Sequence, residues 1–111
     1  MNIVQNTTEV IAFECLSNGT PFDLTSASEI EISLKQDISG VLKTHLLSDS
    51  EVNITGDDNE ICYAAFTPTE TLAFLAGFAK AQCRIKDASG TVIGNVARMV
   101  VVYPCNSTEA L

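Results

Sequence analysis

The chain has 111 residues, of which 46% are hydrophobic and 18% charged, so it has room for one domain with its own core, spanning residues 1–111. Its formal net charge of −8 excludes nucleic acid as the expected partner, because phosphate groups repel it. No apolar run is long enough to span a membrane, and residues 1–8 lack the basic start and apolar stretch of a signal peptide. The composition therefore predicts a protein made inside the cell, without a membrane partner.

Apolar and polar residues alternate along most of the chain, which is typical of half-buried β-strands. In chain order, the alternation predicts seven strands, at residues 9–16, 28–36, 41–46, 51–55, 60–66, 78–86 and 91–103. Short strands separated by turns every ~8–12 residues indicate an all-β sandwich or barrel. Of the two, we favour an antiparallel sandwich of two sheets.

The second and sixth predicted strands show the alternation most clearly. Because successive side chains of a strand point to opposite faces, each strand has one apolar and one charged face. The predicted core residues are Ile30, Ile32, Leu34, Cys83 and Ile85. The predicted outer residues are Glu29, Glu31, Lys80 and Arg84, whose opposite charges attract if the two strands are neighbours.

Two connections carry the same Asp-x-Ser-Gly sequence, at residues 37–40 and 87–90. Asp can bond the backbone ahead of it and Gly accepts a positive φ, so both predict tight hairpins. Residues 18–24 contain Gly19 and Pro21, which interrupt a strand and predict a connection between sheets instead of a hairpin. Residues 67–75 begin with a Thr cap and an acidic first turn, which predicts a short helix at one end of the sandwich.

The four cysteines are Cys15, Cys62, Cys83 and Cys105, and no two of them form a C-x-x-C pair. Closed zinc sites usually come as short paired knuckles, so the spacing argues against zinc, and we expect no metal or cofactor. Free and mostly buried thiols are the expected state, since a domain of this size can fold without staples. The alternative is a disulfide framework of the kind found in secreted domains.

No group of residues forms a recognisable catalytic motif. His45 is the single histidine and lies in a short strand, where we expect it to be solvated rather than to act as a base. Residues 57–60 read Asp-Asp-Asn-Glu, which offers oxygen ligands but lacks the spacing of a calcium loop, so a solvated turn is expected. The sequence therefore predicts a protein that is not an enzyme.

Four Asn-x-Ser/Thr triplets begin at Asn6, Asn18, Asn53 and Asn106. They match the acceptor for N-glycosylation, which operates only in a secretory pathway. The other interpretation, which we favour, is that they reflect turn chemistry in a chain rich in Ser and Thr.

The last predicted strand is apolar on both faces from residue 96 to residue 103, apart from Arg98. A sandwich strand ordinarily has one face in water, so something should cover the second face. The chain's own ends, residues 3–4 or the segment after Pro104, are one candidate, and another subunit is the other. The predicted interface residues are Met99, Val100, Val101, Val102 and Tyr103.

With the strands placed, several segments match a known family: GTPFDLT at 19–25, EIEISLK at 29–35, ETL at 70–72 with Gly77, and QCRIK at 82–86 with GTV at 90–92. Over about residues 9–103 the chain resembles the N-terminal domain of phage baseplate upper proteins and related prophage structural proteins of Gram-positive bacteria. The resemblance implies an Ig-like sandwich that builds tail or baseplate assemblies and carries no catalytic residues or cofactor.

These observations together predict a non-enzymatic structural module of a phage or prophage virion, assembled in the bacterial cytoplasm. It would act through contacts with further copies of itself or with other tail subunits. The alternative is a secreted or cell-surface Ig-like adhesion domain, which would account for the glycosylation triplets and the even number of cysteines.

Overall fold

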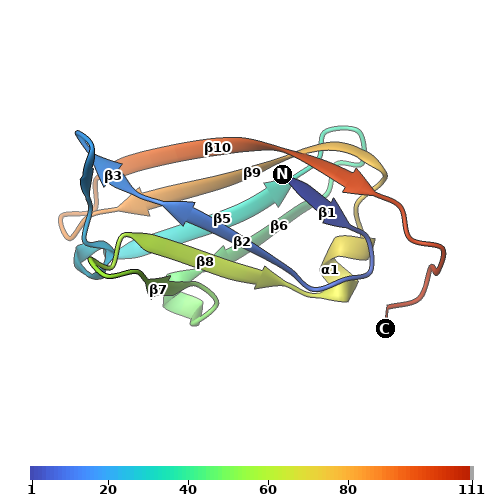
Figure 1. Ribbon diagram of the computed structural model, residues 1–111, viewed down its shortest axis with the longest axis horizontal. Helices are drawn as coiled ribbons and strands as arrows, with labels where there is room; N and C mark the ends of the chain where they lie inside the picture. The colour runs from blue at the N-terminus through green and yellow to red at the C-terminus, as the bar shows by residue number, and fades with distance from the viewer. Residues whose placement is uncertain (111) are drawn as a thin grey trace.

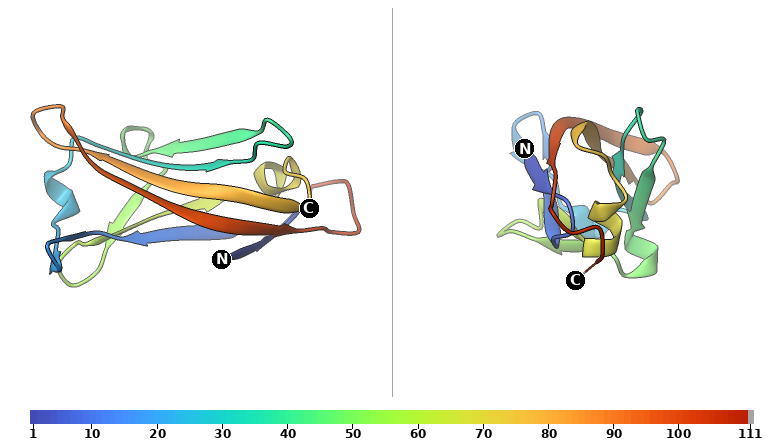
Figure 2. Two further views of the ribbon diagram at one scale, coloured as in Figure 1. Left: turned by 90° about the horizontal axis from the view of Figure 1, so that it is seen from above. Right: turned by 90° about the vertical axis from the view of Figure 1, so that its right-hand side faces the viewer.

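A computed structural model describes residues 1–110 as two β-sheets packed face to face (Figure 1). The larger sheet has the strand order β1 (Asn2–Val4), β10 (Val92–Tyr103), β9 (Gly77–Lys86), β5 (Glu29–Lys35) and β6 (Leu42–Leu46). The smaller sheet has the order β2 (Glu9–Glu14), β8 (Ile61–Phe66) and β7 (Asn53–Thr55). The sandwich is elongated, with extents of 43 × 23 × 23 Å (Figure 2).

All seven predicted strands are present, and the predicted class, an Ig-like β-sandwich, is confirmed. The chain also forms β1, which pairs in parallel with the end of β10 and is the one departure from antiparallel pairing in the larger sheet. The alternation did not predict β1, because three residues are too short to show a period of two.

The connection at residues 18–24 contains a hairpin, contrary to the prediction. It joins β3 (Leu16–Ser17) to β4 (Thr20–Pro21). Asn18 has φ 53° and Gly19 has φ 78°, and positive φ at both central residues is what a tight two-residue hairpin turn requires. A short 3-10 helix, η1 (Leu24–Ser26), then leads the chain to the larger sheet.

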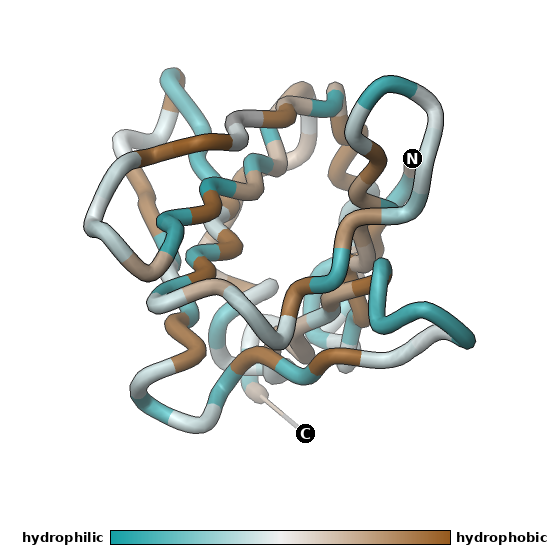
Figure 3. The backbone as a smooth tube through the Cα atoms, turned by 90° about the vertical axis from the view of Figure 1, so that its left-hand side faces the viewer, coloured by the Kyte–Doolittle hydropathy of each residue, from teal (hydrophilic) through white to brown (hydrophobic). Residues whose placement is uncertain are grey.

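The core lies between the sheets, so that the chain encircles it when seen end-on (Figure 3). Its largest fully buried side chains are Phe13, Phe66 and Phe74. All five predicted core residues of β5 and β9 are at most 5% exposed. On the outer face, Arg84 Nε and Nη2 donate to the two carboxylate oxygens of Glu31 at 2.8 and 3.0 Å. The two residues lie opposite each other in the paired strands β5 and β9, which is the pairing that the opposite charges favour.

Both predicted hairpins are present, joining β5 to β6 and β9 to β10. In the second, Asp87 Oδ1 accepts hydrogen bonds from the amides of Ser89 and Thr91, and Gly90 adopts φ 87°. The carboxylate thus bonds the backbone ahead of it, and this lowers the pKa of Asp87, chiefly through its bond with the Ser89 hydroxyl.

The predicted helix is α1 (Pro68–Leu72), and it closes one end of the sandwich (Figure 1). Thr67 caps it with a reciprocal pair of bonds: the Thr67 hydroxyl accepts from the Glu70 amide at 3.2 Å, and Glu70 Oε1 accepts from the Thr67 amide at 3.0 Å. The Thr71 hydroxyl is fully buried and donates to the Thr7 carbonyl, which ties the helix to the segment before β2.

Thr67→Ala should lower the free energy of unfolding by about 1 kcal/mol, because it removes the acceptor for the Glu70 amide. Thr69→Ala is the matched control, since Thr69 is exposed on the same helix and Ala is the better helix former. Chemical denaturation of both variants measures the difference. Equal stability of the two would mean that the capping box contributes nothing.

Candidate interaction surface and buried thiol cluster

The two apolar faces of β10 have different surroundings. Val100 and Val102 point into the core and are 0% and 2% exposed, so they cannot contact another chain in the folded domain. Met99 and Tyr103 point outward and are 62% and 47% exposed, and Val101 between them is half-buried. Val100 and Val102 are therefore removed from the five predicted interface residues, and Met99, Val101 and Tyr103 remain as candidates.

Neighbouring strands extend this outward strip. Val101 lies opposite Phe78 of β9, which is 68% exposed, and Tyr103 lies opposite Val4 of β1. Ile38, in the turn after β5, lines a shallow pocket of about 350 Å³ together with Phe78 and Met99. We call the set the outer apolar patch; its members are Val4, Ile38, Phe78, Met99, Val101 and Tyr103.

The chain's own ends do not cover the outer apolar patch. Ile3 is buried in the core, and β1 extends the edge of the larger sheet instead of lying across its face. After Pro104 the chain leaves the sheet (Figure 1) and bonds to the N-terminal segment, where Gln5 Oε1 accepts from the Cys105 amide. Of the two predicted candidates for a cover, the chain ends are therefore excluded in the part of the chain that the structure describes.

The outer face of the larger sheet also differs in charge from the rest of the molecule. The registers place four of the six basic side chains on it and only two of the 14 acidic ones, Glu29 and Glu31. The basic residues are Lys35, Lys80, Arg84 and Lys86. Asp37, which lines the same pocket as Ile38 and Met99, adds one negative charge, so this face carries a net charge of +1 and the remainder of the chain carries −9.

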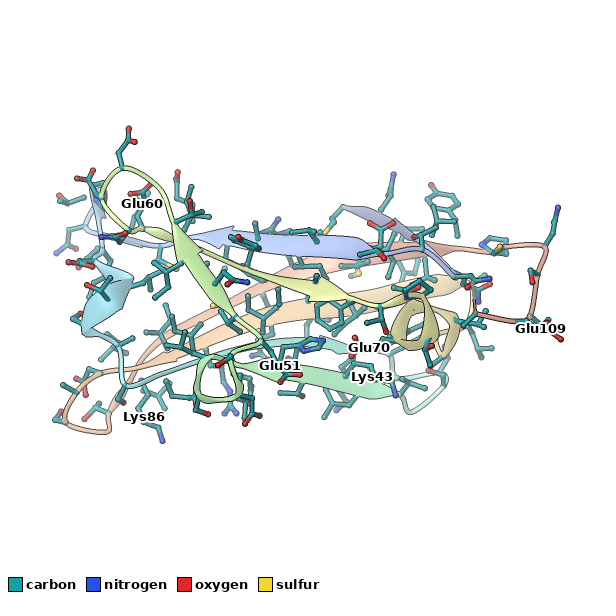
Figure 4. The ribbon with its side chains drawn as sticks, turned by 90° about the horizontal axis from the view of Figure 1, so that it is seen from below. Lys43, Glu51, Glu60, Glu70, Lys86 and Glu109 are labelled. Carbon is teal, nitrogen blue, oxygen red and sulfur yellow. The ribbon has the colours of Figure 1, made fainter. Side chains whose placement is uncertain are left out.

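His45 is buried, contrary to the prediction that it is solvated. Its Nε2 lies 2.9 Å from Glu70 Oε2, and its Nδ1 lies 3.0 Å from Glu51 Oε2 without the alignment of a hydrogen bond. The two carboxylates come from α1 and from the segment after η2 (Leu47–Asp49), and both are labelled in Figure 4. His45 also stacks edge-on against Phe66, with ring centroids 4.6 Å apart. The contacts join β6 to α1, which is a structural role.

Three of the four cysteines meet between the sheets. The Sγ atoms of Cys15, Cys62 and Cys83 all lie within 4.8 Å of one another, and those of Cys62 and Cys83 are 3.6 Å apart. Cys15 follows the end of β2, Cys62 lies in β8 and Cys83 lies in β9, so both sheets contribute. The three side chains are 6%, 0% and 1% exposed, which confirms the predicted burial. Cys105 is half-buried and lies outside the cluster.

Hydrogen bonds among the three thiols shift their pKa values in opposite directions. Hydrogen bonds from Cys62 and then Cys83 favour the thiolate of Cys15 and lower its pKa below the ordinary range. The bonds to Cys15 raise the pKa of Cys62 and of Cys83, because those thiols must keep their protons to donate, and burial adds to the effect. The cluster therefore gives up one proton more readily than the others.

The spacing of the cysteines in the chain does not reveal this cluster, because its three members are 47 and 21 residues apart. The signal that could have found it is the inward position of Cys62 and Cys83 in their alternating strands. That signal becomes useful only once the strand order is known.

Arg98 is the one charged residue of the apolar part of β10, and it points inward at the open edge between β10 and β2. Its Nη2 donates to the carbonyl of Ala12 on the opposite sheet at 2.6 Å, and its guanidinium lies 4.5 Å from the centroid of the Phe13 ring. Val96, opposite Cys83 in the register, is 46% exposed although it faces the core. The sandwich is thus thinly covered along this edge, next to the thiols.

The acidic segment at 57–60 forms a turn, as predicted. Glu60 Oε2 accepts from the Asp58 amide at 2.9 Å, so the carboxylate folds back onto its own backbone. None of the helices in residues 1–110 is both long enough and apolar enough to cross a membrane.

We compared the chain with protein families, curated proteins and solved structures. No protein-family model matches the chain, and no curated protein matches it. Among solved structures, CopC from Methylosinus trichosporium OB3b is similar at 14% identity with a TM-score of 0.43, over 87% of this chain and 98% of that one. This sequence identity and this TM-score are too low to support a conclusion about the chain.

Proposed function

We propose that this domain is a non-enzymatic structural module of a phage or prophage virion, assembled in the bacterial cytoplasm as part of a tail or baseplate, and that it works through contacts between proteins. The observation that carries the proposal is the outer apolar patch, which is exposed on a well-packed sheet. Exposed apolar patches of this kind mark contact sites between proteins. The resemblance to baseplate upper proteins supports the virion setting.

Charge indicates which contact the face makes. Two copies packed face to face would bring two faces of net positive charge together, which is unfavourable. The rest of the chain carries −9, so a second copy offers many acidic surfaces that complement the basic face. We therefore expect a head-to-tail contact between copies, in which the larger sheet of one copy binds an acidic surface of the next. Contacts of this type close into rings when the rotation permits.

The outer apolar patch can supply enough energy for such a contact. Burying a side chain such as Met99 or Phe78 contributes roughly 1.5–3 kcal/mol relative to leaving it in water. A few of them in the centre of an interface, with basic residues around them, are enough for a modest affinity.

Light scattering over a concentration series from micromolar to sub-millimolar tests the proposal. We expect wild type to assemble as its concentration rises and to dissociate at high salt, since screening weakens the charge contribution. Met99→Glu should weaken assembly by about tenfold or more, because it removes an apolar contact and places a negative charge against an acidic surface. Met99→Lys should weaken it less, because it removes only the apolar contact.

The matched control is Val10→Glu, which adds the same charge at a residue that is 55% exposed on the smaller sheet. Assembly of this variant should not fall below that of wild type, because the added negative charge lies on the acidic part of the chain and does not oppose the basic face. A wild type that stays monomeric over the whole series and binds no other tail subunit would contradict the proposal. Equal weakening by Met99→Glu and Met99→Lys would exclude the head-to-tail contact with an acidic surface.

The second candidate function is a secreted or cell-surface Ig-like adhesion domain. The observation that favours it is the set of four glycosylation triplets. Asn6 and Asn18 adopt φ 61° and φ 53°, which is turn chemistry, whereas Asn53 lies in β7 and is exposed. Mass spectrometry of the protein from its native source distinguishes the two, since glycan on Asn53 requires a secretory route.

A further inference from the structure

We propose that Cys15, Cys62 and Cys83 form a binding site for one Cu(I) ion between the two sheets. This inference rests on the geometry of the thiol cluster and is independent of the proposed assembly function.

The spacing of the sulfurs suits one central ion. An ion bonded to three thiolates at about 2.3 Å holds their sulfurs about 4 Å apart. The three Sγ atoms lie within 4.8 Å of one another, with 3.6 Å between Cys62 and Cys83. Small side-chain rotations are therefore enough to reach the bound geometry.

The donor set selects a soft ion. Soft thiolates favour Cu(I), Zn²⁺ and iron–sulfur clusters. Structural Zn²⁺ takes four ligands and iron–sulfur clusters take four cysteines, whereas Cu(I) is satisfied by two or three sulfurs. Among the residues that the structure describes, no histidine, aspartate, glutamate or fourth cysteine joins the group. The Cys62 thiol donates a hydrogen bond to the Phe13 carbonyl at 3.9 Å.

Binding is a ligand exchange without electron transfer. Cu(I) bonds to the three sulfurs as thiolates, three thiol protons leave to solvent, and two net negative charges remain in the cluster. Burial disfavours those charges, and the bonds from the ion to all three sulfurs offset part of that cost. Burial also keeps water and oxidants away from the reduced ion.

The ion has a path to the site. Cys83 is paired in register with Val96, which is 46% exposed, so the thiols lie beneath the thinly covered edge between β10 and β2. Cys15 is the most exposed of the three at 6% and lies at the end of β2 on that edge. Cys15 is therefore the residue that would contact an arriving ion first.

The test is an anaerobic titration of the reduced full chain with Cu(I) against a chromogenic Cu(I) chelator. We expect one ion per chain, an ultraviolet sulfur-to-copper charge-transfer band and an X-ray absorption spectrum with sulfur neighbours alone. Cys15→Ser and Cys83→Ser should each weaken binding by more than the ~10–100-fold that loss of an outer-shell partner costs. Cys105→Ser is the matched control and should bind as wild type does.

A readout on the wild type alone guards against variants that fail to fold. With Cu(I) bound, an alkylating reagent should modify the three cluster thiols more slowly than in the metal-free protein, Cys105 should react equally in both, and the thermal midpoint should rise. Four outcomes would overturn the proposal: no Cu(I) held in competition with the chelator, binding lost equally in Cys105→Ser, Zn²⁺ held at least as tightly as Cu(I), or a Cys62–Cys83 disulfide that forms under the anaerobic conditions of the titration.

Discussion

Val100→Lys is expected to unfold the domain, whereas Met99→Lys is expected to leave it folded. Val100 is 0% exposed and packs between the sheets, so a lysine there must bury its ammonium group or force the sheets apart. Loss of the Val side chain removes roughly 1.5–3 kcal/mol of burial, and an unpaired buried charge costs several kcal/mol more. The sum approaches the whole stability of a typical domain, about 5–15 kcal/mol.

Met99 is the neighbouring residue on the same strand, but its side chain lies in water in the single chain. Circular dichroism and chemical denaturation of the two variants measure the contrast. Because a slip of one residue moves every side chain of a strand to the other face, the pair also tests the register of β10. Equal stability of the two variants would show that the register is wrong.

Gln36→Leu is expected to lower the free energy of unfolding by about 3 kcal/mol or more, since it leaves buried backbone groups unpaired at about 1–3 kcal/mol each. Gln36 is fully buried, and its side chain binds the segment between α1 and β9. Its Nε2 donates to the carbonyls of Leu75 and Phe78 at 2.7 and 3.3 Å, and its Oε1 accepts from the Leu75 amide at 2.8 Å.

Gln36→Glu separates the two halves of this contact. The carboxylate can still accept from the Leu75 amide but cannot donate to the two carbonyls. Hydrogen exchange should therefore show the Leu75 amide protected in Gln36→Glu and exposed in Gln36→Leu. Since Gln36 also positions the start of β9, both variants should weaken assembly through Phe78. Stability of Gln36→Leu within about 0.5 kcal/mol of wild type would contradict the role of Gln36, because surface changes without such contacts stay in that range.

The alternation of residues was sufficient to predict the strands and much of the core. Ile30, Ile32 and Leu34 alternate with polar and charged residues, so the apolar face of β5 is the one expected to line the core. The two Asp-x-Ser-Gly turns and the Thr67 cap were also predictable, because turn and cap chemistry depend on residues within four positions of one another.

The alternation could not decide which face of β10 lies outward. Residues 99–103 are apolar on both faces, so the pattern gives no preference between Val100 with Val102 and Met99 with Val101. The position of β9 and β1 on either side of β10 settles the choice. His45 was misjudged for a related reason: its carboxylate partners, Glu51 and Glu70, reach it from two other segments.

Local periodicity thus determined the fold class, the strands and the polarity of their faces, because a strand's pattern is set by its own sequence. The tertiary structure alone decided the thiol cluster, in which Cys15, Cys62 and Cys83 come from three segments that are far apart in the chain. The same holds for the outer apolar patch, whose members lie on β1, β9, β10 and a turn. Both the cluster and the patch depend on the order of strands in each sheet and on how the sheets pack. Neither the strand order nor the packing can be predicted from a short stretch of sequence.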